Sequence, residues 1–210
     1  MQADIHENIN GWGKAPNIVK AIDMGSPTGI LWANANLGFK KSTSDIGDRY
    51  SWGDFGNSGC HYLSNEDPDS PYANIMTSRF QDEEFEKNCL KLSHDVANKE
   101  WGGKWRIPSF WQFKELLDYC DIEYIHQPTC GYLRFISQKT GNILFLPFNR
   151  YERDNEGNRG KLIDWTQGYW SRCYSCKDLA WLFTDRRDLD QELCKAGLPI
   201  RPVWMPDLKL

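Results

Sequence analysis

The sequence predicts one α+β domain, with two helices in its first half and a mostly antiparallel sheet completed by its C-terminal segment. Two helix signals occur before about residue 120, and short apolar runs of strand length follow them. The length of 210 residues suits one large domain. We expect a leader at residues 1–17 and the domain at 18–206, with loop insertions at about 53–90 and 149–167.

The first expected element is a hairpin-like pair of strands. Apolar runs at residues 18–23 and 30–33 flank the turn sequence GSPTG at 25–29. Glycine and proline at such a position favour a reversal of the chain between two strands. Residues 53–75 are rich in Gly, Asn, Asp, Ser and Pro, and they predict a long loop.

Two helices are expected next. The first covers residues 94–101, with Ser93 as a candidate N-cap. The second begins after Ser109, because Gln112 follows at the spacing of a capping box. The apolar residues beyond this cap recur at helical spacing, at Phe113, Leu116, Leu117 and Cys120. The acidic side chains near its end predict a solvated helix end, at Asp118, Asp121 and Glu123.

Short strands are expected beyond the second helix. The runs that predict them lie at residues 132–136, 143–146, 169–171, 179–183 and 200–204. A turn at residues 140–142 joins the first two of these strands, and the charged stretch 150–159 predicts an exposed loop.

Composition and charge exclude several classes of function. The net charge is −4 and no basic run exceeds two residues, which argues against nucleic-acid binding. No stretch approaches the ~18 apolar residues of a membrane span, and the polar N-terminus does not indicate a signal peptide. Ten Trp, nine Tyr and ten Phe are an unusual number of rings, and such side chains dominate binding surfaces. Seven cysteines are an odd count, so we expect most of them to be reduced.

Seven blocks of the sequence, in order, resemble those of one known family. They lie at residues 22–33 (IDMGSPTGILWA), 36–38 (NLG), 47–53 (GDRYSWG), 95–109 (DVANKEWGGKWRIPS), 141–147 (GNILFLP), 168–171 (GYWS) and 200–203 (IRPV). The chain thus resembles the Bacteroidetes paralogous domains of the C-type-lectin fold. The resemblance implies a C-type-lectin-like fold for nearly the whole chain.

Several large residues in these blocks are expected to be structural. Trp101 and Trp105 flank two glycines, and with Phe113 they are expected in the core. Arg106 and Arg201 are expected to be partly buried, with their guanidinium groups holding backbone carbonyls.

Metal and catalytic chemistry find little support in the sequence. Cys173 and Cys176 have the spacing of zinc ligands, but no second pair accompanies them. Residues 127–129 (QPT) lack the acidic residue that a calcium-dependent lectin supplies. We therefore expect no metal, no cofactor and no catalytic residue. One enzymatic alternative stays open, because formylglycine-generating copper oxidases of this fold place two cysteines in a comparable region.

The segment 170–198 predicts a binding face. Cys, Arg, Tyr, Trp and Asp crowd there without the period of a core element, on what the family resemblance implies is a fixed scaffold. The expected ligand-binding residues are Arg172, Cys173, Tyr174, Ser175, Cys176, Asp178, Trp181, Phe183, Asp185, Arg187 and Asp190. The expected partner is a protein or glycan on another cell or particle, with no nucleic acid and no membrane insertion. A solvated loop face, or a structural surface or assembly subunit, is the alternative.

The same segment resembles the diversified region of retroelement variable proteins, which use this fold. Their mutated adenines often fall in AAC codons, and most of the predicted binding residues can be reached from AAC, although Trp181 cannot. This resemblance implies a hypervariable binding face that acts on a phage particle or at a cell surface, outside the cell; a cytoplasmic location is the alternative.

Overall fold

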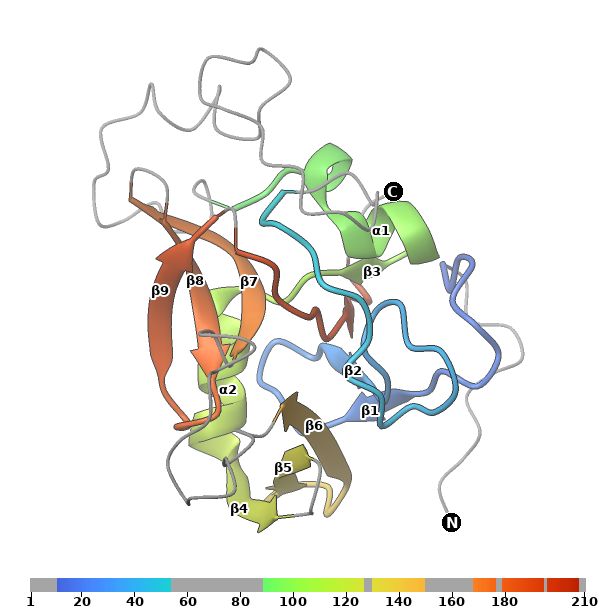
Figure 1. The fold of residues 1–210 in the computed structure, drawn as a ribbon. Helices are drawn as coiled ribbons and strands as arrows, with labels where there is room; N and C mark the ends of the chain where they lie inside the picture. Colours follow the sequence, from blue (N-terminus) through green and yellow to red (C-terminus); the bar gives the residue numbers. More distant parts are fainter. Residues whose placement is uncertain are drawn as a thin grey trace.

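The computed structural model of the chain describes residues 11–53, 89–126, 130–149, 168–176, 179–194 and 196–207. Within these ranges the chain forms two α-helices and ten strands, which pair into three antiparallel sheets (Figure 1). The expected mixture of few helices with antiparallel sheet is confirmed. The two predicted loop insertions, at about 53–90 and 149–167, lie almost wholly outside the described residues.

The first sheet joins the two ends of the described chain. β1 (Ala21–Asp23) and β2 (Leu31–Ala33) form the expected antiparallel hairpin. β10 (Val203–Trp204) lies between β2 and β3 (Trp105–Arg106), so the strand order is β1-β2-β10-β3. Segments that are far apart in the sequence therefore meet in this sheet.

Both predicted helices are present, but the first begins later than expected. A short 3-10 helix (Leu92–His94) comes before α1 (Val96–Trp101), and the N-cap of α1 is Asp95 instead of Ser93. The Asp95 carboxylate accepts a hydrogen bond from the Asn98 amide at 3.1 Å, as N-cap residues do.

The second helix, α2 (Phe110–Tyr119), has the predicted capping box at Ser109. The Gln112 amide donates to the Ser109 hydroxyl at 3.2 Å, and the Ser109 amide donates back to the Gln112 side chain at 2.7 Å. These reciprocal bonds satisfy donors that a helix start otherwise leaves unpaired, so this boundary was readable from local sequence alone.

The second sheet contains a strand that we did not predict. β4 (Cys120–His126) begins directly after α2 and pairs with β5 (Cys130–Ser137), which pairs with β6 (Ile143–Asn149). Asp121 and Glu123, expected at a solvated helix end, are exposed residues of β4. Cys120, expected on the apolar face of the helix, is instead the first residue of β4, because Cys120 to Glu123 alternate between buried or half-buried apolar and exposed acidic side chains.

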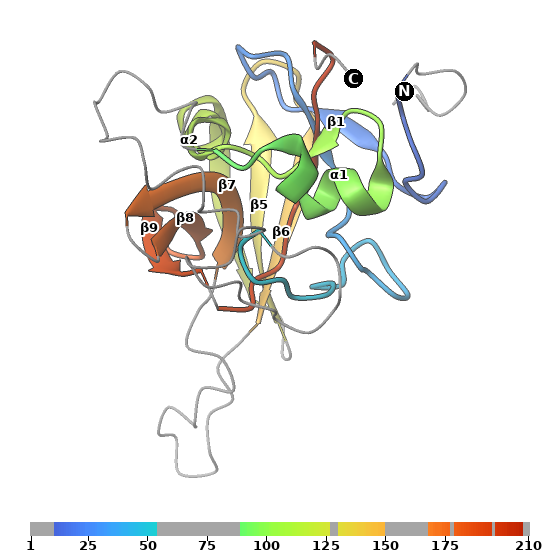
Figure 2. The same ribbon diagram turned by 90° about the horizontal axis from the view of Figure 1, so that it is seen from above.

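The third sheet consists of β7 (Gly168–Cys176), β8 (Leu179–Thr184) and β9 (Leu189–Leu193). α2 packs against β7 and β8, beside which it runs in Figure 1. Figure 2 shows β5 and β6 between the β7–β9 sheet and the part of the molecule that holds α1 and β1.

The core contains the aromatic residues that the sequence placed there. Trp101, Trp105 and Phe113 are all at most 5 % exposed. The Trp12 ring packs edge-on against Trp105 at 4.9 Å, and Ala15 is buried. The described end of the expected leader, residues 11–17, therefore packs against the domain.

Two buried arginines join separate segments of the fold. Arg201 is fully buried and donates to the carbonyls of Ala33 at 2.9 Å and Phe145 at 3.0 Å, as expected. Arg106 donates to the Leu90 carbonyl at 2.9 Å, and it also forms an ion pair with the buried Asp95 at 2.7 Å. Sequence reasoning missed that carboxylate partner.

Candidate functional site

The candidate site is built around a bulge in β7. This strand pairs regularly with β8 at Trp170 and again at Tyr174, but between them β7 has three residues where β8 has one. The extra residues bow β7 out of the ladder, as bulges near functional sites often do. Arg172 lies in the middle of the bulge, where its amide donates to the Pro108 carbonyl and its carbonyl accepts from the Leu90 amide, both at 2.8 Å.

The bulge aims the Arg172 side chain at the start of α2. Its Nη1 atom donates to the Gln112 side-chain oxygen at 3.1 Å and to the Ile107 carbonyl at 3.3 Å, and it lies 4.0 Å from the Met205 sulfur. All three partners are neutral, and no carboxylate of the described residues lies within ion-pair distance of this guanidinium. The hydrogen-bond partners of this half-buried positive charge are thus neutral, and Asp207, the acidic residue in the wall of the adjoining pocket, forms no ion pair with it among the described contacts.

A pocket of about 160 Å³ opens beside this guanidinium. Its wall contains both polar and less polar residues. The polar ones are Thr28, Ser109, Gln112, Arg172 and Asp207, and the less polar ones are Ile30, Cys89, Trp111, Met205 and Pro206. Pockets for whole small molecules usually measure roughly 300–1,000 Å³. This smaller volume suits one side chain or one sugar unit of a larger partner.

Three aromatic rings form a cluster that reaches the pocket through Trp111, and we call them the aromatic patch: Phe110, Trp111 and Trp181. The Phe110 ring lies 5.2 Å from the Trp111 ring and 4.8 Å from the Trp181 ring. Trp111, which also lines the pocket, is 46 % exposed. The first turn of α2 and the middle of β8 therefore bring these rings together next to Arg172.

Sequence reasoning missed Phe110 and Trp111. A signal was present for Trp111, because it lies two positions before the buried Phe113, about 200° away around the helix. Tryptophan is enriched among the residues that dominate binding, so a tryptophan on the solvent side of a helix indicates an interaction surface.

Three predicted binding residues belong to the core instead of a surface. Cys173, Tyr174 and Phe183 are 1 %, 2 % and 0 % exposed. The Tyr174 ring packs 5.7 Å from Trp52, and the Phe183 ring stacks on Phe113 at 5.1 Å. Their predicted place on the binding face was wrong, because these three side chains pack into the core.

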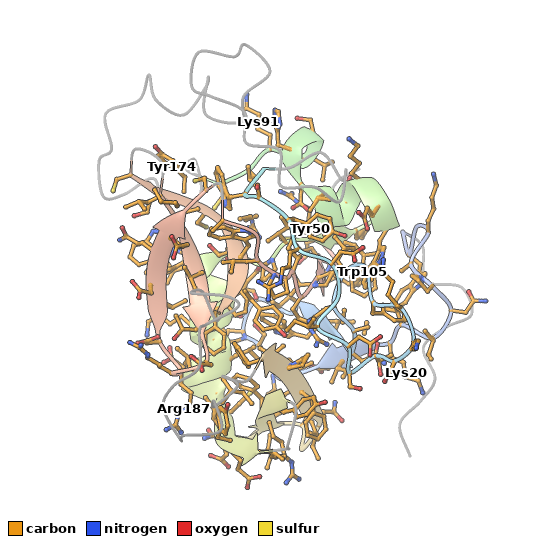
Figure 3. All side chains as sticks on the ribbon, in the orientation of Figure 1. Lys20, Tyr50, Lys91, Trp105, Tyr174 and Arg187 are labelled. Atoms are coloured by element: carbon orange, nitrogen blue, oxygen red, sulfur yellow. The ribbon has the colours of Figure 1, made fainter. Side chains whose placement is uncertain are left out.

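Two further predicted residues lie in the turn between β8 and β9, away from the pocket. Figure 3 shows Arg187 and Tyr174 at opposite ends of this sheet. The Thr184 hydroxyl and the Asp188 carboxylate share a hydrogen bond across the turn, and Arg187 has a positive φ of 65°. Burial raises the pKa of Asp185 in this turn above its ordinary value.

The other predicted residues lie apart from Arg172. Ser175 and the exposed Cys176 are at the end of β7, and Asp190 is an exposed residue of β9. Asp178 lies outside the described residues. Of the predicted set, the structure brings Arg172 and Trp181 together at the start of α2.

The cysteine that lies opposite Cys173 in the structure is Cys89, not the Cys176 that the sequence spacing suggested. The backbone of Cys173 pairs with that of Cys89 in an antiparallel β-bridge. Neither Cys173 nor Cys176 is in a disulfide. No group of three or more His, Cys, Asp or Glu residues in the described part of the chain is arranged to hold a metal ion.

Comparison of the chain with family models, curated proteins and solved structures found no match. Among the described helices, none has the length and apolar character needed to cross a membrane.

Proposed function

We propose that this chain is a recognition module that binds a protein or glycan on another cell or particle through Arg172 and the aromatic patch. The observation that carries the proposal is the exposed Trp111 beside a half-buried arginine whose described partners are neutral. Tryptophan and arginine are the residue types in which binding energy most often concentrates. A partner group with negative charge would complement the guanidinium.

The scaffold that we propose for this site is C-type-lectin-like. Its support is that blocks far apart in the sequence meet in one sheet. The blocks at 22–33, 95–109 and 200–203 contribute residues to all four strands of the order β1-β2-β10-β3. Blocks that share a buried sheet act as framework, which leaves the start of α2 and the β7 bulge for recognition.

Hypervariability, if this chain carries it, would be confined to exposed positions. Random side chains at Cys173, Tyr174 or Phe183 would enter a packed core, where large-to-small or oversized replacements cost several kcal/mol. Cys176, Arg187 and Asp190 are exposed, and substitutions there leave the core intact.

Replacement of Trp111 by Ala tests the proposal. A glycan array and a panel of intact bacterial cells, probed with the fluorescently labelled chain, would first supply a binding target. Loss of a central aromatic anchor costs about 2 kcal/mol or more, so we expect affinity to fall about 30-fold. The melting temperature is expected to change little, because the side chain is exposed.

Tyr119→Ala is the matched control, because Tyr119 is 44 % exposed at the other end of α2. Binding equal to that of the unmodified chain is expected for this variant. Equal losses in both variants, or full binding by Trp111→Ala, would contradict a site at the aromatic patch. Arg172→Gln removes the positive charge, so its weaker binding at low salt would indicate a negatively charged partner.

A further inference from the structure

Cys89 and Cys173 face each other across two antiparallel segments. The Leu90 amide donates to the Arg172 carbonyl at 2.8 Å, and the two cysteines form the adjacent bridge. This hydrogen bond flanks the pair, so the cysteines occupy a non-hydrogen-bonded position of the ladder. Opposed Cα atoms at such positions are about 4.5 Å apart, closer than at any other position.

That separation suits a disulfide without movement of the backbone. Disulfides join residues whose Cα atoms lie roughly 4.4–6.8 Å apart. Both cysteines carry thiols in this structure. The β7 bulge fixes Cys173, while Cys89 lies in the wall of the pocket, partly exposed. The chain therefore holds two thiols in register, one accessible and one buried.

The surroundings of the pair favour a thiolate at Cys173. A hydrogen bond between the two sulfurs raises the pKa of Cys89 and lowers that of Cys173. The Phe110 amide, at the start of α2, and the nearby Arg172 lower the pKa of Cys173 further. A helix N-terminus and a neighbouring cation are the features that activate cysteines elsewhere.

We propose that Cys89 and Cys173 form a redox-active dithiol, which is oxidised to a disulfide by exchange with a low-molecular-weight disulfide such as oxidised glutathione. The redox chemistry of this pair does not require the recognition function proposed above, although Cys89 lines the same pocket.

The exchange proceeds in two balanced steps. The accessible Cys89 sulfur attacks one sulfur of the small disulfide as its shared proton moves to Cys173, and the first small thiolate leaves. That thiolate takes the proton from Cys173. The Cys173 sulfur then attacks the Cys89 sulfur and releases the second small thiolate, which is protonated by solvent. Two electrons thus pass from the cysteine pair to the small disulfide, which becomes two thiols.

The product would tie the segment at residue 89 to the β7 bulge. A cross-link between positions so far apart in the sequence restricts the unfolded chain strongly. For a chain of this size, we expect the melting temperature to rise by about 5–15 °C when the pair is oxidised.

The test equilibrates the full chain in glutathione buffers of increasing oxidised fraction. It then traps the remaining thiols with an alkylating agent in denaturant, so that the buried Cys173 also reacts, and maps the peptides by mass spectrometry. We expect a Cys89–Cys173 cross-linked peptide to appear together with the rise in melting temperature. Mapping of the unmodified chain needs no variant, so the proposal stays testable even if a substitution impairs folding.

Two variants complete the test. Cys89→Ser is expected to match the reduced chain in melting temperature and to lose both the cross-link and the stabilisation. Cys176→Ser, at an exposed position of the same strand, is expected to keep both. Cys89 and Cys173 that remain alkylatable at every ratio, a cross-link of Cys173 to another cysteine, or one equivalent of metal held by the pair would each overturn the proposal.

Discussion

The β4–β6 and β7–β9 sheets differ in regularity, and that difference separates framework from site. Every position of β4 from Cys120 to His126 pairs in unbroken register with β5, and β6 continues the ladder. β7 instead leaves its register with β8 on either side of Tyr174. In the regular sheet, alternate side chains point into the core. In the irregular sheet, the bulge directs Arg172 toward α2.

The hydrogen bonds of the two sheets show how this works. In the regular sheet, backbone partners lie within the sheet, so Leu133 and Phe135 point inward by alternation alone. At the bulge, the backbone of Arg172 is bonded to Pro108 and Leu90, which lie outside the sheet. An irregular strand is therefore held as firmly as a regular one, by elements that also build the pocket.

The largest effect is expected where the two sheets meet. The Phe183 ring of β8 lies 6.0 Å from Phe135 of β5 and 6.5 Å from Phe148 of β6. Phe183→Ala is expected to lower the free energy of unfolding by about 3–5 kcal/mol, because it leaves a cavity between the sheets. Urea denaturation followed by fluorescence measures the change.

A substitution on the outer side of the regular sheet is the matched control. Phe145 of β6 is 44 % exposed, and Phe145→Ala is expected to cost under about 1 kcal/mol. If Phe183→Ala kept its stability and lost ligand binding, Phe183 would belong to the recognition surface, as the sequence first suggested.

An intermediate effect is expected at the hairpin turns of the two sheets. The β5–β6 turn has Gly141 at φ 71°, whereas the β8–β9 turn has Arg187 at φ 65°. Gly141→Ala is expected to destabilise by about 1 kcal/mol, because the left-handed region disfavours a side chain. Arg187→Gly is expected to stabilise by roughly 0.5 kcal/mol, since relief of that cost exceeds the added freedom of the unfolded chain.

Thermal unfolding of the two variants side by side provides the measurement. Added atoms at Gly141 meet no neighbour within 4 Å, so backbone conformation alone determines the result there. Changes of the same sign in both variants would show that the two turns do not differ in strain.

The smallest effect is expected from the pH dependence of the β8–β9 turn. Burial raises the pKa of Asp185, so the folded chain binds this proton more tightly than the unfolded chain does. Stability is lost as the pH rises through the ordinary aspartate pKa to the raised one, and no more is lost above it. Asp185→Asn is expected to be more stable at pH 7, by no more than about 0.5 kcal/mol, and unchanged near pH 3.

Chemical denaturation at several pH values measures this difference. A variant whose advantage grew as the pH fell would contradict the direction of the pKa shift.

Local sequence signals predicted the elements that depend on neighbouring residues. The capping box at Ser109 located the start of α2, and the apolar runs located β5, β6 and β8. β4 was missed because no glycine or proline separates it from α2. β9 was missed because its three central residues are polar and its burial does not alternate. Burial of Arg201 was predictable, since this residue lies inside the apolar run that forms the last strand.

The site was less predictable because it depends on contacts between distant segments. The β7 bulge arises from pairing with β8 and from bonds to Pro108 and Leu90, none of which has a local signature. The same is true of Cys89 and Cys173. The CxxC spacing drew attention to Cys176, whereas the partner that Cys173 faces comes from before α1.

Because β10 lies between β2 and β3, a ribosome must have made the chain up to residue 204 before the four-stranded sheet can close. Arg201 arrives equally late, so the carbonyls of Ala33 and Phe145 meet their guanidinium partner only after that stretch has left the exit tunnel. Until then the β1–β2 hairpin exposes apolar surface, including Trp32, which is fully buried in the finished molecule. The first sheet of the chain is thus completed in one late step, by a few residues made after nearly all the others.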